Sequence, residues 1–581
     1  MNELLWTPTK ERAENSQMKK FQESLGVVGD YKSFHDFSIT NSKDFWNGLI
    51  DFYSLTYEGS LDPALSEGGF DHYRWYPNVQ LSFAENLLKR GRDSAIAFNF
   101  QHESGKNKKI TYKEVREKTA GLAHFLKDYL AVGDVLAAYM PNIPETAIAM
   151  LATSSLGGVF TSTSCDFGIA GVLDRFSQSK PKVLIAAVGY EYNGKYFDLH
   201  DRLREIEENL PSLESLILVD FLGRGIDLSR FKKAVSLESL YQTKEELRFK
   251  KLPFAHPLYI MYSSGTTGKP KCIVHSQGGT LLGHLKELGL HSDLTDKKKI
   301  FFFTTCGWMM WNWLVSSLTF GAEIILYEGS PAYPSPEHYF KMIDREGISI
   351  FGTSPKFLKA LEDTNAQMNS EFPTLETILS TGSPLLPEQY DYVYQHVKKD
   401  VQLSSISGGT DIIGCFMLGN PILPVYRGEI QCKGLGLDVR AINERGESLI
   451  EQEGELVCAQ TFPNRPIAFL NDPNDEKLKA AYFDQNKGLW THGDYIKITT
   501  HGGVIVYGRS DATLNPGGVR IGTAEIYRQT ESLSFILDSL CVGKNVEGDV
   551  DVLLFVKMKE GEELTAERVK QIKQLIKQNT T

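Results

Sequence analysis

Paired cysteines are missing from this sequence. Its 581 residues include 7 cysteines, which are scattered along the chain without a C-x-x-C pair. Structural zinc sites and disulfide frameworks need cysteines at close, regular spacing. We therefore expect reduced thiols in a cytoplasmic protein, with neither a zinc site nor a disulfide framework.

An excess of basic residues and a long apolar run are also missing. The chain has 62 Lys and Arg against 73 Asp and Glu, a formal net charge of −11, whereas nucleic-acid binding favours a basic face. No uninterrupted apolar run approaches the roughly 20 residues that span a bilayer, and the first residues lack the pattern of a secretory signal. We expect small-molecule partners and neither nucleic acid nor a membrane, and we leave the oligomeric state open.

What is present is the pattern of a large α/β protein. A chain of 581 residues is too long for one ordinary core, so at least two domains are expected. From about residue 93, apolar strands expected at 94–98, 133–140 and 183–187 alternate with helical patterns. Thr111 and Glu114 have the spacing of a helix capping box. This alternation predicts open, largely parallel sheets covered by helices.

The densest polar motif is the run from Ser263 to Lys269, in which every residue is Ser, Thr, Gly or Lys. It follows a buried strand predicted over 258–262. Glycines let the backbone expose N–H groups, so such a loop can wrap the oxygens of a polyphosphate. A flexible polar turn is the alternative, but the preceding apolar strand favours a phosphate loop.

The spacing of this motif excludes a Walker-type loop. That loop has four residues between its glycines and then opens a helix. Here two residues separate Gly265 from Gly268, Pro270 follows Lys269, and residues 271–275 predict a second strand. A strand–loop–strand phosphate grip resembles that of the adenylate-forming enzymes, the acyl-CoA synthetase and luciferase superfamily.

The resemblance extends over essentially the whole chain. The aromatic run at 75–79, followed by Ala-Glu-Asn-Leu-Leu at 84–88, is similar to the lead-in of acetyl-CoA and acetoacetyl-CoA synthetases. The resemblance implies a large N-terminal domain of stacked α/β subdomains with a β-barrel-like segment, and a small, incomplete α+β C-terminal domain. We divide the chain into a lead-in segment (1–90), an AMP-binding domain (91–510) and a mobile C-terminal domain (511–581).

Three further polar loops follow predicted strands, in the order found in the superfamily. Loops at the carboxyl ends of parallel strands are where α/β proteins place ligands, and a carboxylate suits a ribose diol because it accepts both hydroxyl protons. The resemblance implies that Asp494 and Arg509 bind the ribose and that Asp411, a Glu in the family, binds Mg²⁺. The other implied nucleotide-binding residues are Ser263, Ser264, Gly265, Thr267, Gly268, Gly382, Ser383 and Pro384.

Catalytic and coenzyme A contacts are also implied by the resemblance. Thr266, Lys269, Thr410 and Arg520 would act on the phosphates in catalysis. Gly518 would open the path for the coenzyme A thiol. An Arg near position 175 would bind the coenzyme phosphates, although Arg175 would equally fit a helix-surface pair with Asp174.

The acyl pocket is expected around a tryptophan-rich run at 304–313, which resembles that of acetoacetyl-CoA synthetases. Three Trp within six residues fit either core packing or a shaped apolar cavity. Gly408 falls where acetyl-CoA synthetases place a Trp that closes the pocket, and the alternative is a glycine that serves a tight turn. The expected pocket residues are Trp308, Met309, Met310, Thr381 and Gly408.

The C-terminal end departs from the family pattern. Asp511 matches the position at which the small domain swings, and 581 − 511 = 70 residues follow it. They predict strands at 536–542 and 550–556 and a helix at 565–579. They contain no Pro-x-Thr-x-x-Gly-Lys segment, whose Lys stabilises charge during adenylation in relatives. We therefore expect a shortened C-terminal domain.

The implied reaction has two steps and uses ATP, Mg²⁺ and coenzyme A. A carboxylate attacks the α-phosphate of ATP, giving acyl-AMP and pyrophosphate, and the coenzyme A thiol then displaces AMP. Acetoacetate is the first choice of acid; acetate or propionate is the second. A nucleotide- or acyl-binding protein with impaired adenylation is the alternative of another class.

Overall fold

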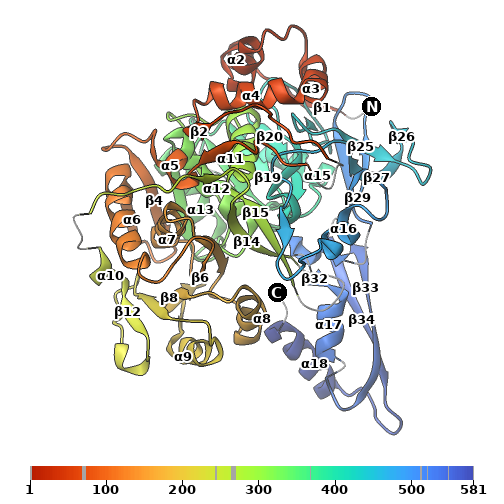
Figure 1. Ribbon diagram of the computed structural model, residues 1–581. Helices are drawn as coiled ribbons and strands as arrows, with labels where there is room; N and C mark the ends of the chain where they lie inside the picture. Colours follow the sequence, from red (N-terminus) through yellow and green to blue (C-terminus); the bar gives the residue numbers. More distant parts are fainter. Residues whose placement is uncertain are drawn as a thin grey trace.

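Two largely parallel sheets form the body of the molecule, with helices on their faces (Figure 1). The computed structural model describes residues 3–68, 73–241, 245–263, 270–364, 366, 368, 370–510, 513–519, 521–530, 532–546 and 549–579. The fold of these residues is α/β with several sheets, which confirms the class predicted from the alternating pattern.

The first sheet carries the predicted phosphate hairpin near one edge. β15 runs antiparallel to β14, whereas the strands from β12 to β14 are parallel to their neighbours. β8 is apolar and buried throughout, as expected for a strand covered on both faces, and it coincides with the predicted strand 183–187. In spatial order the strands are β12 (Ala234–Ser236), β11 (Ser215–Val219), β8 (Val183–Ala187), β6 (Val135–Tyr139), β7 (Val159–Thr163), β14 (Pro257–Ser263), β15 (Lys271–Ser276) and β28 (Ala468–Phe469).

The second sheet carries two of the predicted polar loops. β19 and β20 are parallel neighbours, so the loops that leave them emerge at the same edge. Only the β4–β5 pair is antiparallel among the described pairings of this sheet. In spatial order the strands are β20 (Gln402–Ser405), β19 (Thr377–Ser380), β18 (Ile350–Thr353), β16 (Lys299–Phe302), β17 (Glu323–Glu328), β4 (Ile96–His102) and β5 (Asn107–Thr111).

Two antiparallel sheets follow and correspond to the barrel-like segment that the resemblance implies. The larger has the order β26 (Ser448–Leu449), β25 (Val439–Ile442), β27 (Glu453–Cys458), β29 (Trp490–Ile498) and β30 (Val504–Arg509). The smaller contains β21 (Ser407–Gly409), β22 (Gly414–Leu418) and β24 (Cys432–Lys433). A bridge between Ile430 and Val504 connects the segment before β24 to β30.

The helices of the body pack on and between the sheets. α6 begins with the expected capping box, in which Thr111 and Glu114 each accept a hydrogen bond from the other's backbone N–H. Every residue of α7 is buried, so this helix lies inside the body. The helices are α5 (Phe83–Leu88), α6 (Tyr112–Leu126), α7 (Pro144–Ser155), α8 (Ile169–Ser179), α9 (His200–Asn209), α10 (Leu237–Leu240), α11 (Gln277–His284), α12 (Met309–Val315), α13 (Pro336–Glu346), α14 (Pro355–Asp363), α15 (Pro387–Tyr392) and α16 (Glu476–Tyr482), with the π-helical η2 (Leu285–His291) and the 3₁₀ turn η5 (Thr410–Ile412).

The N-terminal segment folds back over the body. Phe21, Phe34, Phe45 and Trp46 are fully buried and belong to the main hydrophobic core. The segment contains β1 (Leu4–Trp6), which pairs with β23 (Val425–Tyr426), the helices α1 (Lys10–Asn15), α2 (Gln17–Ser24), α3 (Tyr31–Thr40) and α4 (Ser42–Phe52), and the strands β2 (Tyr57–Gly59) and β3 (Val79–Leu81), of which β3 also pairs with β13 (Leu252–Pro253).

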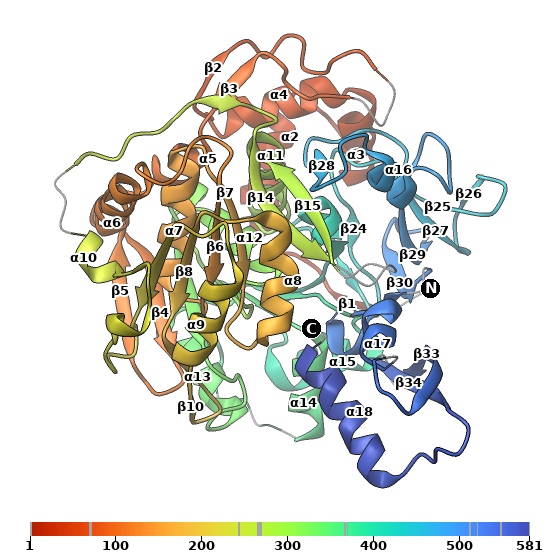
Figure 2. The same ribbon diagram turned by 60° about the horizontal axis from the view of Figure 1, so that its bottom comes forward.

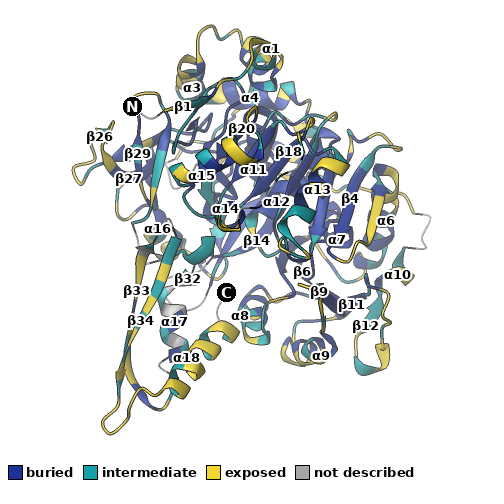
Figure 3. Ribbon diagram, turned by 180° about the vertical axis from the view of Figure 1, so that it is seen from behind, coloured by how far each residue is buried: buried dark blue, intermediate teal, exposed yellow. Residues whose placement is uncertain are grey.

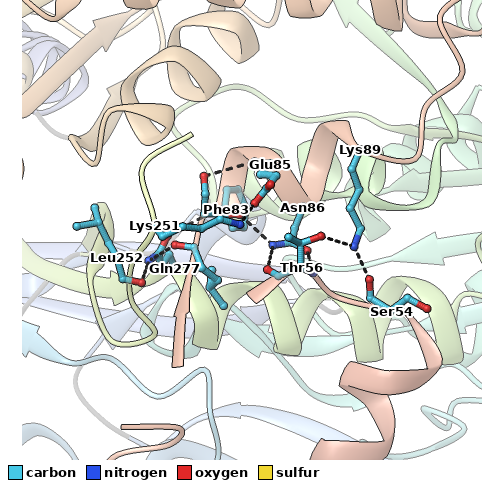
Figure 4. A network of polar contacts seen from close by, with 11 residues as sticks. Ser54, Thr56, Phe83, Glu85, Asn86, Lys89, Lys251, Leu252 and Gln277 are labelled. Atoms are coloured by element: carbon cyan, nitrogen blue, oxygen red, sulfur yellow. Dashed lines mark hydrogen bonds and ion pairs between the residues drawn. The ribbon is translucent and has the colours of Figure 1, made fainter. Parts of the chain in front are cut away.

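A polar network connects this segment to α5 and α11 (Figure 4). The side-chain amide of Gln277 donates to the carbonyls of Leu81 and Leu252 at 3.0 and 2.9 Å. Asn86 donates to the carbonyl of Thr56 at 3.0 Å and accepts from its backbone N–H at 2.8 Å. Because these amides satisfy buried backbone groups, they fix the lead-in in one register on the body.

The last residues form a small α+β unit at the end of the molecule opposite α2 and α4 (Figures 1 and 2). It has two apolar clusters of its own, one around Ile526 and Cys541 and one around Phe535 and Ile572. Much of its ribbon is exposed (Figure 3). The elements are β31 (Thr513–Leu514), β32 (Ile521–Gly522), α17 (Thr523–Thr530), β33 (Ile536–Val546), β34 (Asp549–Met558) and α18 (Ala566–Asn579). Of the helices described here and above, none is long and apolar enough to cross a membrane.

Candidate functional site

The predicted polar loops from the different sheets lie against one another. His275 on β15 donates from Nε2 to the carbonyl of Thr410 at 2.8 Å. The hydroxyl of Thr381 donates to the carbonyl of Ile406 at 2.8 Å. A Cβ on Gly409 would lie 3.3 Å from the ring of His492 on β29. The structure therefore brings together loops that the sequence only places in order.

Most residues of the predicted phosphate loop lie outside the part of the chain that the structure describes. Ser264, Gly265, Thr266, Thr267, Gly268 and Lys269 lie outside the described residues, and so do Arg520 and Asp511. The ends of the loop are described: Ser263 and Lys271 pair across the β14–β15 hairpin. The buried hydroxyl of Ser263 has no hydrogen-bond partner within the described part of the chain. The roles implied for the loop stay predictions.

Thr410 is held in place by a histidine that the sequence analysis missed. His275 is 1% exposed, and burial lowers its pKa to about 4. The ring is therefore neutral at pH 7 and donates one N–H to the Thr410 carbonyl. The hydrogen bond anchors η5 to the phosphate hairpin. His275 lies within an apolar strand pattern, and no local signal distinguishes it.

Asp411, the predicted magnesium ligand, is a buried carboxylate in η5. It is 2% exposed, and its Oδ1 accepts a hydrogen bond from the hydroxyl of Tyr482 at 2.6 Å. The described residues contain no group of three or more His, Cys, Asp or Glu side chains that could hold a metal. Mg²⁺ commonly binds through one or two carboxylates together with water and substrate phosphates. One carboxylate beside the β14–β15 hairpin fits that kind of site.

Asp494 and Arg509, the predicted ribose contacts, face each other across β29 and β30. Nη1 of Arg509 lies 3.0 Å from Oδ1 of Asp494, and Nη2 donates to the carbonyl of His492 at 3.2 Å. Glu455 accepts from the backbone N–H of Gly493 at 3.1 Å, and burial raises the pKa of its carboxyl. The pairing of β27, β29 and β30 thus fixes the positions of Asp494 and Arg509.

Replacing Asp494 with alanine is expected to weaken ATP and AMP binding by about 1.5–3 kcal/mol, the range for hydrogen bonds to a charged group. Titration calorimetry measures this. Asp438→Ala is the matched control, because Asp438 also pairs with an arginine of the same sheet, Arg440, at 2.6 Å. Unchanged nucleotide affinity in Asp494→Ala, or an equal loss in the control, would remove Asp494 from the site.

The tryptophan-rich run divides between the surface and the core. Trp308 is 39% exposed, whereas Trp311 and Trp313 are fully buried. Trp311 donates to the side chain of Asn142 at 3.1 Å, and Trp313 donates to Glu287 at 3.0 Å. Of the predicted pocket residues in this run, Met309 is half-buried and Met310 is buried. Core packing thus accounts for Trp311 and Trp313.

Gly408 has a packing reason to be glycine. It lies on β21, where a Cβ would be 2.0 Å from the carbonyl oxygen of Gly414 and 2.4 Å from Cα of Cys415. Both atoms are backbone, so no side chain fits without a shift of β22. This close approach supports the structural alternative for Gly408, in the form of strand packing rather than a tight turn. Its effect on acid selectivity stays a prediction.

Arg175, predicted to bind coenzyme A, is buried instead of lying on a solvated helix face. It is 7% exposed; Nη1 donates to the carbonyl of Gly171 at 2.9 Å, and the guanidinium lies 4.6 Å from the ring centroid of Phe167. Arg175 therefore does not lie on the helix surface, because its guanidinium packs inward. A role toward the coenzyme stays a prediction.

The segment around Gly518 contacts the loop that contains the predicted nucleotide-binding residues Gly382, Ser383 and Pro384. The side-chain amide of Asn515 donates to the carbonyl of Gly382 at 2.9 Å, and a Cβ on Gly518 would lie 3.1 Å from the same carbonyl. Ser383 and Pro384 are half-buried beside it. A separate surface hollow of about 330 Å³, lined by residues such as Leu218, contains none of the predicted site residues.

Comparison with known proteins finds relatives along nearly the whole chain. The family of AMP-binding enzymes matches residues 83–462. Acetoacetyl-coenzyme A synthetase of Rhizobium meliloti (strain 1021) is 45% identical over 99% of this chain and 89% of its own length. Acetoacetyl-CoA synthetase of Xenopus tropicalis is 42% identical over 99% of this chain and 88% of its own length.

A solved structure extends the similarity to the fold. Acetoacetyl-CoA synthetase from Streptomyces lividans superposes with a TM-score of 0.85 at 36% identity, covering 99% of this chain and 90% of that chain. Sequence identity of 36–45% thus extends over nearly the full length of this chain. The chain belongs to the acetoacetyl-CoA synthetase family of AMP-binding enzymes.

Proposed function

We propose that this chain is an AMP-forming ligase that joins acetoacetate to coenzyme A. One observation carries the proposal: the similarity to acetoacetyl-CoA synthetases covers 99% of the chain, so it includes every candidate loop. ATP, coenzyme A and the acid are the substrates. We also propose a cytoplasmic location, because the seven cysteines are all free and buried.

In the first step a carboxylate oxygen of the acid attacks the α-phosphorus of ATP. The bond to the β-phosphate breaks, and pyrophosphate leaves with its electron pair. Thr410, anchored by His275, and the loop from Ser263 to Lys269 would hold the phosphates; Asp494 and Arg509 would hold the ribose. Bound at Asp411, Mg²⁺ would neutralise phosphate charge. Positioning and charge neutralisation supply most of the rate in such transfers.

In the second step the coenzyme A thiolate attacks the acyl carbon of the acyl-AMP. A carbon–sulfur bond forms, the carbon–oxygen bond to AMP breaks, and AMP leaves. Gly518 lies against the Gly382 loop, and we retain the proposal that this glycine opens the path for the thiol. We also retain the division into residues 1–90, 91–510 and 511–581, which the separate apolar clusters of the C-terminal unit support.

Pyrophosphate release and thioester formation with acetoacetate, acetate and propionate test the proposal. We expect kcat/KM to be highest for acetoacetate, by about tenfold or more, the scale on which enclosed pockets separate small acids. Butyrate is the control, because it matches the length of acetoacetate without the keto oxygen. Equal rates with every acid would contradict the acetoacetate assignment. Nucleotide binding without pyrophosphate release would favour the binding-protein alternative.

A further inference from the structure

Tyr482 at the end of α16 is fixed by aromatic packing on two sides. Its ring lies 3.8 Å from that of Trp490, with an angle of 14° between the planes. The ring of Phe469 meets it edge-on at 5.8 Å and 76°. The side chain is 3% exposed. Because β28 and β29 thus fix the ring, they also fix the position of its hydroxyl.

That hydroxyl engages the carboxylate of Asp411. The distance from the hydroxyl to Oδ1 is 2.6 Å, which is typical of a charge-assisted hydrogen bond. The second carboxylate oxygen, Oδ2, lies on the side of the Gly409 turn, 3.3 Å from the position of a Cβ there. The hydrogen bond from Tyr482 therefore limits the orientations that this short side chain can adopt.

The same ring also contacts a cation beside the phosphate loop. Nζ of Lys271 lies 5.8 Å from the ring centroid of Tyr482 and 6.0 Å from that of Phe469. Lys271 begins β15, directly after the loop that ends at Pro270. One tyrosine therefore contacts a carboxylate through its hydroxyl and a cation through its face, within the range of cation–π attraction.

We propose that Tyr482 is a positioning residue for the phosphates of the nucleotide. Its hydroxyl holds the Asp411 carboxylate in the orientation that magnesium-bound ATP requires, and its ring steadies Lys271 at the base of the loop. The inference rests on the proposed function, which assigns Asp411 to Mg²⁺. In this proposal Tyr482 acts through Asp411, to which its hydroxyl donates, and takes no part in the reaction itself.

Tyr482→Phe tests the proposal, because it removes the hydroxyl and keeps the ring between Trp490 and Phe469. ATP binding is measured by calorimetry in Mg²⁺ and in EDTA, together with the thermal unfolding midpoint. We expect about a tenfold weaker binding in Mg²⁺, the loss typical of a hydrogen bond to a charged group, and no change in EDTA. Tyr112→Phe is the matched control; that buried hydroxyl donates to the carbonyl of Ala322 at 2.9 Å, on another part of the fold.

A double variant separates positioning from general packing. If Tyr482 acts through Asp411, then Tyr482→Phe with Asp411→Asn binds ATP as Asp411→Asn alone does. Additive losses, equal losses with and without Mg²⁺, wild-type affinity in Tyr482→Phe, or loss of its fold would each overturn the inference. If the wild type releases no pyrophosphate with acetoacetate while Tyr482→Phe shows the magnesium-specific loss, the proposed ligase reaction fails, but the assignment of Mg²⁺ to Asp411 and the inference that rests on it stand.

Discussion

Replacing Glu287 with alanine is expected to lower the free energy of unfolding by about 3–5 kcal/mol, the cost of breaking a fully buried ion pair. Glu287 and Lys286 on η2 are both 0% exposed, and Nζ of Lys286 lies 3.5 Å from Oε1 of Glu287. The carboxylate also accepts from the indole of Trp313 and the backbone N–H of Cys415, each at 3.0 Å. Burial raises the pKa of Glu287, although Lys286 opposes this.

Chemical denaturation measures the effect, and a double variant provides its control. Lys286→Met with Glu287→Gln removes the buried charge and keeps an acceptor at position 287, so most of the lost stability should return. If Glu287→Ala unfolds at the same denaturant concentration as the wild type, the ion pair does not contribute to the free energy of unfolding. Recovery in the double variant would show that the fold tolerates uncharged side chains at both positions, and that the single variant fails because it removes one member of the pair.

Glu328 is expected to make the protein less stable as the pH rises. This carboxyl at the end of β17 is fully buried, and burial raises its pKa from 4.5 to about 8, although the backbone N–H of Asn142 donates to it at 2.7 Å. Below about pH 5 the folded and unfolded states both hold the proton. Between pH 5 and 8 only the folded state holds it, so stability falls with pH by up to about 1.4 kcal/mol per unit and levels off above 8.

Glu328→Gln removes that slope, because glutamine is uncharged at every pH. Unfolding midpoints of the variant and the wild type, measured from pH 5 to 9, should therefore diverge as the wild type loses stability. Glu346→Gln is the control: burial raises the pKa of Glu346, but hydrogen bonds from Asn99, Arg345 and Lys109 outweigh burial and lower it to about 2. Its difference from the wild type should stay constant over this range. Parallel curves for Glu328→Gln would show that Glu328 is already ionised at pH 5.

Local sequence determines the elements of the body well. β8 matches its predicted range because the apolar run at 183–187 follows Pro181, which marks the turn before it. The capping box at Thr111 forms as predicted because its two hydrogen bonds involve only residues three apart. Apolar periodicity and capping act over a few residues, so a sequence displays them directly.

Contacts between distant segments could not be read in this way. Tyr482, whose hydroxyl donates to Asp411, lies 71 positions away along the chain, and no sequence pattern near either residue predicts this hydrogen bond. Trp308 and Trp311 look alike in sequence, but the first is 39% exposed, whereas the second is buried and donates to the side chain of Asn142, which arrives from another strand–helix unit. The glycine at 408 likewise reflects the path of β22. Such features depend on tertiary packing.

The contact between Gly382 and Gly518 determines how closely the C-terminal unit can approach the body. Both residues have positive φ angles, 105° and 81°, and backbone rests on backbone without an intervening side chain. A methyl group at position 518 would lie 3.1 Å from the Gly382 carbonyl, so the neighbouring backbone would have to shift slightly to accommodate it. Glycine at position 518, which has no side-chain carbon, therefore allows the C-terminal unit to pack this closely against the body.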